Sequence, residues 1–164
     1  MKTAAWIFLF VTGVAALRAG PADWLPLERE VAEITRGSQI TVVHFWAPWC
    51  GNCKTELAGG GWRDFIGKNS DVRFVFVTIW HGEDGRAVLE KAGVGGQPNF
   101  VLRLHPNPAR RGDGRMKAFL DLPVSWIPTT WVFKEGTLRY ALNWGEVRFD
   151  MLERMVADAR EKWE

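Results

Sequence analysis

The sequence predicts an α/β fold in which a central mixed β-sheet is flanked by helices. Three observations support this prediction. Ile40 to Trp46 is a continuous run of apolar and β-branched residues with one histidine, typical of a strand buried on both faces as in a parallel sheet, and Val72 to Trp80 is predicted to be a second buried strand. Segments with helical periodicity alternate with these runs. The chain then ends with two short strands around a tight turn and a last helix, so part of the sheet is expected to be antiparallel.

The first half of the domain is predicted to alternate between helix and strand. Leu27, Val31 and Ile34 recur at helical spacing, and Gly37 follows as a stop signal. The elements expected next are a strand over 40–46, a helix from Cys50 to about Lys68, a strand over 72–80 and a short helix over 83–92. Three glycines at 59–61 interrupt the longer helix, so we expect a kink or a break there.

The second half contains a long loop before the sheet resumes. Proline and glycine mark a loop that carries Arg110 and Arg111. The elements expected around it are a strand over 99–104, a short helix over 116–122, strands over 129–133 and 137–142 joined by a turn at 134–136, and a closing helix over 146–163.

The length and composition suit one globular domain preceded by an export signal. The chain has 164 residues, of which 47% are hydrophobic. Residues 4–17 are almost entirely apolar, a length typical of a signal peptide and short for a transmembrane helix, and cleavage would fit after Ala16 or Ala19. We expect residues 1–19 to be a signal peptide, or else an uncleaved anchor, and residues 20–164 to form a domain in the periplasm or otherwise outside the cytoplasm.

The charge balance gives no reason to expect a nucleic-acid partner. The formal net charge is +2, from 21 basic and 19 acidic residues. Removal of residues 1–19 would take away Lys2 and Arg18 and leave the two counts equal.

The segment Trp49-Cys50-Gly51-Asn52-Cys53 follows the first buried strand and holds the only two cysteines of the chain. Two intervening residues allow one thiol to lie at a helix N-terminus and the other one turn inside. Exposed N–H groups and the helix dipole there stabilise a thiolate, so Cys50 can attack at neutral pH and Cys53 can resolve a mixed disulfide. A reversible dithiol/disulfide couple is the leading interpretation, and outside the cytoplasm it would exchange with other disulfides.

Three other uses of the two cysteines stay open. Half of a structural zinc site would need further ligands, and His44, His81 and His105 are scattered singly. An inert buried disulfide fits poorly with a strand-to-helix junction. Two thiolates also suit Cu(I), so a copper-handling module is an alternative.

Three motifs in order resemble the thioredoxin superfamily. Residues 45–54, Phe-Trp-Ala-Pro-Trp-Cys-Gly-Asn-Cys-Lys, resemble its active-site signature, Ile127-Pro128-Thr129 resembles its cis-proline loop, and residues 133–136 resemble the hairpin that follows. The resemblance implies a thioredoxin-like sandwich over residues 27–163, with Pro128 facing the cysteines. Pro98 lies in a superficially similar segment, but only Pro128 is followed by strand, turn, strand and helix.

Within the superfamily the chain is most similar to the TlpA-like and ResA-like extracytoplasmic oxidoreductases. Cys53 to Leu57 matches their cysteine-x-x-glutamate-hydrophobe pattern, and the stretch between Trp80 and Ile127 matches their inserted strand and helix. Ala58 departs from the family pattern because a proline is usual there, so the glycines after it could supply the kink instead. The dipeptide between the cysteines, Gly51-Asn52, matches neither the usual reductant nor the usual strong oxidant.

Two residues near the cysteines each have two interpretations. His44 stands where thioredoxins carry a buried acid, and it is either a proton acceptor for Cys53 or a neutral core histidine. Glu56 either tunes the cysteine pair through its charge or is a solvated helix glutamate.

The tryptophans and the basic residues of the long loop also have two interpretations each. We expect Trp49 to form an apolar rim for a partner, and Trp46, Trp80 and Trp126 to pack in the core. An acidic partner could dock on a set of basic residues, although a solvated charged loop is the favoured interpretation. That set is Arg103, Arg110, Arg111, Arg115 and Lys117.

The resemblance implies an exported thiol-disulfide oxidoreductase that reduces disulfides of partner proteins. It further implies recharging by a membrane electron-transfer protein, a role in cytochrome maturation or metal-site assembly, and backbone contacts from Ile127 and Pro128 to the partner. No cofactor is expected, because Cys50 and Cys53 carry the electrons. The alternatives are a Cu(I)-handling module, a non-catalytic interaction domain, and, within the enzyme class, a disulfide oxidase or isomerase.

Overall fold

The computed structural model describes residues 23–143 and 145–162, and a five-stranded mixed sheet forms its centre. The predicted signal peptide, residues 1–19, lies outside the described residues. The helices are α1 (Pro26–Thr35), α2 (Gly51–Ala58), α3 (Gly61–Lys68), α4 (Arg86–Lys91) and α5 (Phe149–Arg160). The strands are β1 (Thr41–Trp46), β2 (Arg73–Thr78), β3 (Phe100–Leu104), β4 (Ala118–Phe119), β5 (Leu122–Pro123), β6 (Thr129–Lys134) and β7 (Thr137–Leu142).

The strand order in the main sheet is β3-β2-β1-β6-β7. Strands β1, β2 and β3 are parallel, whereas β6 is antiparallel to β1 and to β7. Every residue of β1 is buried, as the continuous apolar run predicted. The predicted mixed α/β sheet is therefore confirmed.

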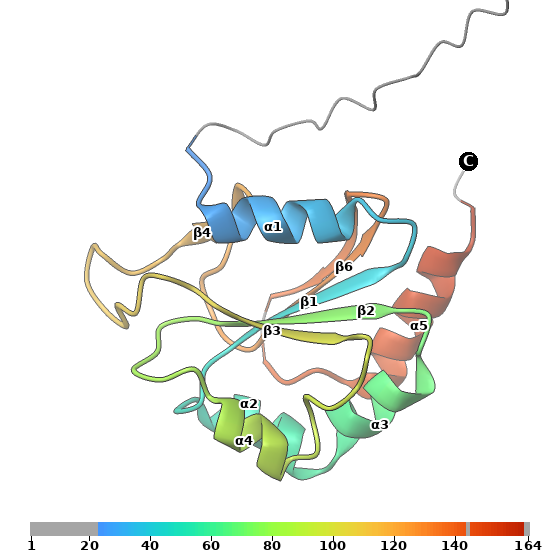
Figure 1. Cartoon of the computed structure of the whole chain (residues 1–164), viewed down its shortest axis with the longest axis horizontal. Helices are drawn as coiled ribbons and strands as arrows, with labels where there is room; N and C mark the ends of the chain where they lie inside the picture. The colour runs from blue at the N-terminus through green and yellow to red at the C-terminus, as the bar shows by residue number, and fades with distance from the viewer. Residues whose placement is uncertain (1–22, 144, 163–164) are drawn as a thin grey trace, which may run out of the picture.

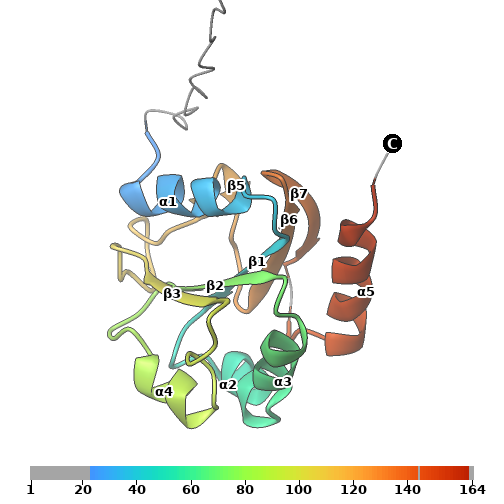
Figure 2. The same ribbon diagram turned by 45° about the vertical axis from the view of Figure 1, so that its right-hand side comes forward.

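Helices cover the two faces of this sheet. Figures 1 and 2 show α1 above the sheet and α2, α3 and α4 below it. Alternation along β1 sends neighbouring side chains to opposite faces. The ring of His44 packs 4.6 Å from those of Trp62 and Phe76, measured between ring centroids, while Phe45 packs against Phe119 and Trp131 on the other face.

The predicted interruption of the helix after Cys50 is a complete break. Helix α2 ends at Ala58, and α3 begins at Gly61 after Gly60, whose φ of +71° suits glycine. Gly61 is needed for a second reason. A Cβ atom there would lie 2.1 Å from the ring of Phe149, so the absence of a side chain lets α5 pack closely on α3.

The helix predicted over 116–122 is wrong. Residues 118–123 form a small antiparallel hairpin, β4–β5, in which Leu120 and Asp121 have φ of +51° and +60°. Tertiary contacts override the local helical pattern. Phe119 is fully buried against Phe45, and the Leu120 N–H donates to the carboxylate of Glu28 in α1 at 2.9 Å.

Two other predicted helices are shorter than expected. Helix α4 begins at Arg86 instead of residue 83, because Gly85 in front of it has a left-handed φ of +78°. Helix α5 covers Phe149–Arg160 instead of 146–163, and its buried residues Leu152, Val156 and Ala159 recur at helical spacing.

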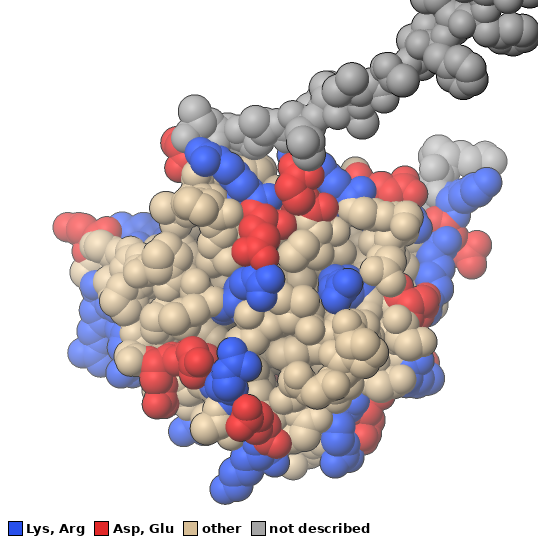
Figure 3. Space-filling model, viewed as in Figure 1, with Lys and Arg blue, Asp and Glu red and all other residues tan. Residues whose placement is uncertain are grey.

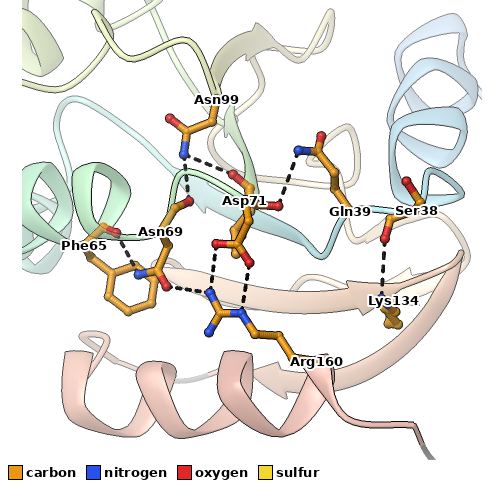
Figure 4. Close-up of polar contacts among 9 residues, drawn as sticks. Ser38, Gln39, Phe65, Asn69, Asp71, Asn99, Lys134 and Arg160 are labelled. Atoms are coloured by element: carbon orange, nitrogen blue, oxygen red, sulfur yellow. Dashed lines mark hydrogen bonds and ion pairs between the residues drawn. The ribbon is translucent and has the colours of Figure 1, made fainter.

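Polar contacts join the C-terminal end of α5 to the turn before β2 (Figure 4). The Arg160 guanidinium donates to both carboxylate oxygens of Asp71 at 3.0 Å and to the Asn69 side chain at 2.9 Å. The hydrogen bond from Arg160 holds the pKa of Asp71 below its usual range. The side-chain amide of Asn99 donates to the backbone oxygens of three residues of this region: Ile66, Asn69 and Val72.

Candidate active site

Cys50 and Cys53 form a disulfide where the loop after β1 enters α2. Cys50 is the N-cap residue of α2, and the Cys53 N–H donates to its Sγ at 3.2 Å. Cys50 is 5% exposed and Cys53 is 1% exposed. An N–H donor and the positive end of a helix both favour a thiolate at Cys50 once the disulfide is reduced.

The loop before β6 brings a second segment to this point. The Ile127–Pro128 peptide bond is cis, and the Ile127 carbonyl oxygen lies 3.8 Å from Cys50 Sγ. Pro98 lies elsewhere. Its carbonyl accepts from Arg73, which pairs with Thr41 at the end of β1 opposite to the cysteines.

His44 is buried on β1, with its ring against those of Trp62 and Phe76. It is 2% exposed, and its Nδ1 lies 2.9 Å from Thr130 Oγ1, because β1–β6 pairing places the two residues directly opposite each other. Its Nε2 lies 3.3 Å from Glu56 Oε2. Among the described residues, no hydrogen bond joins His44 to Cys53; both ring nitrogens face other partners. Thr130 was missed by the sequence analysis, since only strand register reveals it.

Glu56 is a buried residue and not a solvated one. Its carboxylate lies on the inner side of α2, one turn after Cys53, and accepts from the Val147 N–H and, at 3.3 Å, from Trp62 Nε1. With the His44 contact, both carboxylate oxygens have partners inside the protein. A buried carboxylate and a histidine thus lie side by side, and the carboxylate belongs to the same helix as Cys53.

The outer side of the disulfide opens into a cavity of about 310 Å³. Its lining comes from the cysteine loop, the loop after β2, the insertion between β3 and β6, and the cis-proline loop: Trp49, Cys50, Gly51, Asn52, Trp80, Arg110, Arg115, Trp126 and Ile127.

Three of the four tryptophans near the site lie where they were predicted, and one does not. Trp49 is 40% exposed at the rim, and Trp46 and Trp80 are buried, as expected. Trp126 is 49% exposed and lines the cavity, so the prediction that it packs in the core is wrong. It directly precedes the cis-proline segment, which places it at the mouth.

The five basic residues of the predicted docking set lie in different places. Arg103 lies on β3 and pairs with Glu30 of α1, whereas Arg110 and Arg115 line the cavity beside Cys50. Arg111 and Lys117 are exposed. Arg110 is exposed like Arg111 and Lys117, so a solvated charged loop still describes these residues, and Arg110 and Arg115 in addition line the cavity beside Cys50.

The two remaining histidines contact each other where the insertion begins after β3. His81 Nε2 lies 2.7 Å from the His105 carbonyl oxygen. Burial lowers the pKa of His105, and this shift is opposed by the hydrogen bond with the Asn107 backbone and by the charge of Glu28.

Across residues 23–143 and 145–162, no three His, Cys, Asp or Glu side chains gather in a way that suits a metal ion. Within the same ranges no helix has the length and apolar character needed to cross a membrane.

Comparison with known proteins agrees with this geometry. The thioredoxin family model matches residues 28–122. Sporulation thiol-disulfide oxidoreductase A of Bacillus subtilis is 25% identical over 149 residues, which cover 88% of this chain and 79% of that protein. Protein disulfide-isomerase 1 of Caenorhabditis elegans is 27% identical over 128 residues, 74% of this chain but 24% of that longer protein.

Solved structures show the same fold. A secreted Mycobacterium tuberculosis disulfide oxidoreductase homologous to E. coli DsbE has a TM-score of 0.56 at 23% identity and covers 76% of this chain and 85% of its own. A thiol:disulfide interchange protein from Chlorobium tepidum has a TM-score of 0.55 at 18% identity, covering 77% and 83%. With a Cys50–Cys53 disulfide at the start of α2 and a family model that spans more than half of the sequence, the chain belongs to the thioredoxin family and is a thiol-disulfide oxidoreductase.

Proposed function

We propose that the protein is an exported reductant of disulfides in partner proteins. One observation carries this proposal: Cys50 caps α2, with its Sγ accepting the Cys53 N–H and lying beside the Ile127 carbonyl oxygen. This arrangement favours a thiolate at the more exposed sulfur and offers a backbone edge to a partner chain.

The proposed reaction moves two electrons. The Cys50 thiol first loses its proton to water, and its thiolate attacks one sulfur of the partner disulfide, which breaks and releases one partner thiolate; that thiolate takes up a proton from water. Cys53 loses its proton and attacks Cys50 Sγ, releasing the second partner thiolate, which takes up a proton. The partner ends as two thiols and the protein as the Cys50–Cys53 disulfide. The cysteines are the only redox group that this proposal requires.

His44 and Glu56 are proposed to accept the proton that Cys53 loses when it attacks Cys50. Glu56 lies one turn along α2 from Cys53, and His44 contacts its carboxylate. A paired histidine and carboxylate in a dry environment can accept and pass a proton.

The proposed setting lies outside the cytoplasm. The apolar pattern of residues 4–17 and the secreted M. tuberculosis relative support export. The resemblance to TlpA-like and ResA-like proteins supports recharging by a membrane electron-transfer protein and service to cytochrome maturation or metal-site assembly.

The reduction potential of Cys50/Cys53, measured against glutathione, tests the direction of exchange. We expect a value nearer the roughly −270 mV of thioredoxin than the roughly −120 mV of DsbA. A value near −120 mV would indicate an oxidase, and copper retention without disulfide turnover would favour the Cu(I) alternative. Partner binding that survives replacement of both cysteines by serine, without turnover in the wild type, would favour an interaction domain.

Export is tested by N-terminal sequencing of protein from its native host. We expect the mature chain to begin between Ala16 and Asp23. An intact Met1 on soluble cytoplasmic protein would contradict export.

A further inference from the structure

Two arginines supply the charge in the cavity beside Cys50. Of the described residues that line it, only Arg110 and Arg115 have basic side chains, and the rest are tryptophans, glycine, asparagine, isoleucine and the cysteine. Figure 3 shows Lys and Arg gathered at the left edge of the view, where the loop between β3 and β4 protrudes in Figure 1. The site therefore presents positive charge next to the reactive sulfur.

Each arginine is held by a tryptophan. The guanidinium carbon of Arg110 lies 4.0 Å from the Trp49 ring centroid, and that of Arg115 lies 3.5 Å from the Trp80 ring centroid. Arg115 also donates to the Ser125 carbonyl oxygen at 2.8 Å. Stacking restricts the motion of the two arginine side chains and occupies the flat faces of their guanidinium groups. The N–H groups at the guanidinium edges remain available to a planar acceptor such as a carboxylate.

Neither arginine is neutralised within the described part of the chain. The ion pairs found there involve other basic residues, such as Arg103 with Glu30 and Lys117 with Asp113, and none includes Arg110 or Arg115. Two pre-positioned guanidinium groups without a carboxylate partner match a ligand that brings its own carboxylate.

We propose that this rim selects protein disulfides in which an aspartate or glutamate lies next to the cysteine that Cys50 attacks. This inference rests on the proposed function and names its substrate class. Ile127 would contact the partner backbone, and Arg110 and Arg115 would bind the acidic side chain, while Trp49 and Trp126 cover the apolar atoms beside it. The reaction is the two-electron exchange described above, with the partner disulfide as oxidant.

The test uses short peptides dimerised through a single disulfide, with Glu, Gln or Lys beside the cysteine. A neutral small disulfide, 2-hydroxyethyl disulfide, serves as the probe of intrinsic reactivity. The second-order rate constant of reduction is measured for the reduced wild-type protein and for Arg110→Gln, Arg115→Gln and Arg111→Gln. Arg111 is an exposed neighbour in the same loop that does not line the cavity, so its variant controls for net charge.

We expect the wild type to reduce the Glu peptide about fivefold faster than the Gln peptide at low salt, and the Lys peptide most slowly. Arg110→Gln and Arg115→Gln should each lower the Glu-to-Gln ratio about two- to threefold, as for partly exposed ion pairs, and Arg111→Gln should leave it nearly unchanged. The preference should shrink at about 0.15 M salt, where the Debye length is about 8 Å.

Equal rates for the Glu and Gln peptides in the wild type would overturn the inference. So would an equal loss in all three variants, or a loss with the neutral disulfide as large as with the Glu peptide, because the arginines would then act on Cys50 itself. Failure to reduce any disulfide, the neutral one included, would overturn the proposed function as well.

Discussion

At the scale of single residues, the position of Cys50 predicts that its sulfur is the one that attacks a partner disulfide. The N-cap position gives it an N–H donor from Cys53, while Cys53 lies deeper and is nearly inaccessible. The helix terminus stabilises a charge on the first sulfur and not on the second. The asymmetry therefore follows from one turn of helix.

In the reduced protein, Cys50 should be alkylated before Cys53. A free thiol has a pKa of about 8.5 and helix N-termini lower it, so at pH 7 we expect labelling to be at least about tenfold faster at Cys50. Iodoacetamide labelling followed by peptide mass spectrometry measures this ratio. Cys53→Ser should trap mixed disulfides with partners, and Cys50→Ser serves as the control that should not. Preferential labelling of Cys53 would reverse the assignment.

Replacement of His44 by asparagine should affect both stability and rate. The shorter amide cannot reach Glu56 and Thr130 together, so the variant should lose about 1–3 kcal/mol of unfolding free energy through an unpaired buried group. If His44 exchanges a proton during resolution, the pH–rate profile between about pH 5 and 9 should also flatten.

Thr130→Val is the matched control for His44. It removes the Nδ1 partner but keeps the imidazole, so its pH–rate profile should retain the wild-type shape. Denaturant unfolding and reductase rates measure the two effects separately. A His44→Asn profile identical to the wild type would assign His44 to the core alone.

At the scale of elements, two glycines determine how α2, α3 and α5 meet. Gly60 ends the α2 segment with a left-handed conformation, and Gly61 leaves room for the ring of Phe149. That ring also packs 5.3 Å from Trp62 and 5.9 Å from Phe65, measured between centroids. The closing helix is thus fixed by the first turn of α3.

Gly61→Ala should destabilise the fold by about 1–3 kcal/mol, because the added methyl group overlaps the Phe149 ring. Gly67→Ala in the same helix has open space and should instead stabilise by up to about 1 kcal/mol. Urea unfolding of the two variants gives the comparison. Equal stability of Gly61→Ala and the wild type would show that α5 shifts without cost.

At the scale of the whole molecule, the insertion between β3 and β6 is tied to the rest of the domain. Phe119 packs on Phe45 of β1, Leu120 bonds to Glu28 of α1, and His105 contacts His81. Because these contacts are buried, the insertion should unfold together with the sheet.

The free energy of unfolding should fall as the pH is lowered from 7 to 5. Burial lowers the pKa of His105 in the folded state, with Glu28 opposing and His81 adding to the shift, so the unfolded chain binds more protons below its ordinary pKa of about 6.5. One such group contributes a slope of at most about 1.4 kcal/mol per pH unit. Denaturant titrations at several pH values should show a smaller slope for His105→Gln; an unchanged slope would remove His105 as a source.

Local patterns predicted the sheet and the cysteine chemistry, whereas contacts between distant segments were beyond reach. The run from Ile40 to Trp46 gave β1 within one residue, because burial on both faces leaves a continuous apolar sequence. The β4–β5 hairpin failed because the positive φ of Leu120 depends on Phe45 and Glu28. That His44 lies opposite Thr130 follows from the register between β1 and β6, and neither strand's sequence on its own gives that register.

Both cavity arginines belong to one loop that contributes neither cysteine nor the cis-proline. Mutations in that loop can therefore change which partners are recognised while the exchange chemistry is preserved. After gene duplication, two copies of such a protein could diverge in partner choice within a few substitutions and operate in one compartment without cross-talk. We expect such paralogues to differ most between β3 and β4 and to agree around Cys50 and Cys53.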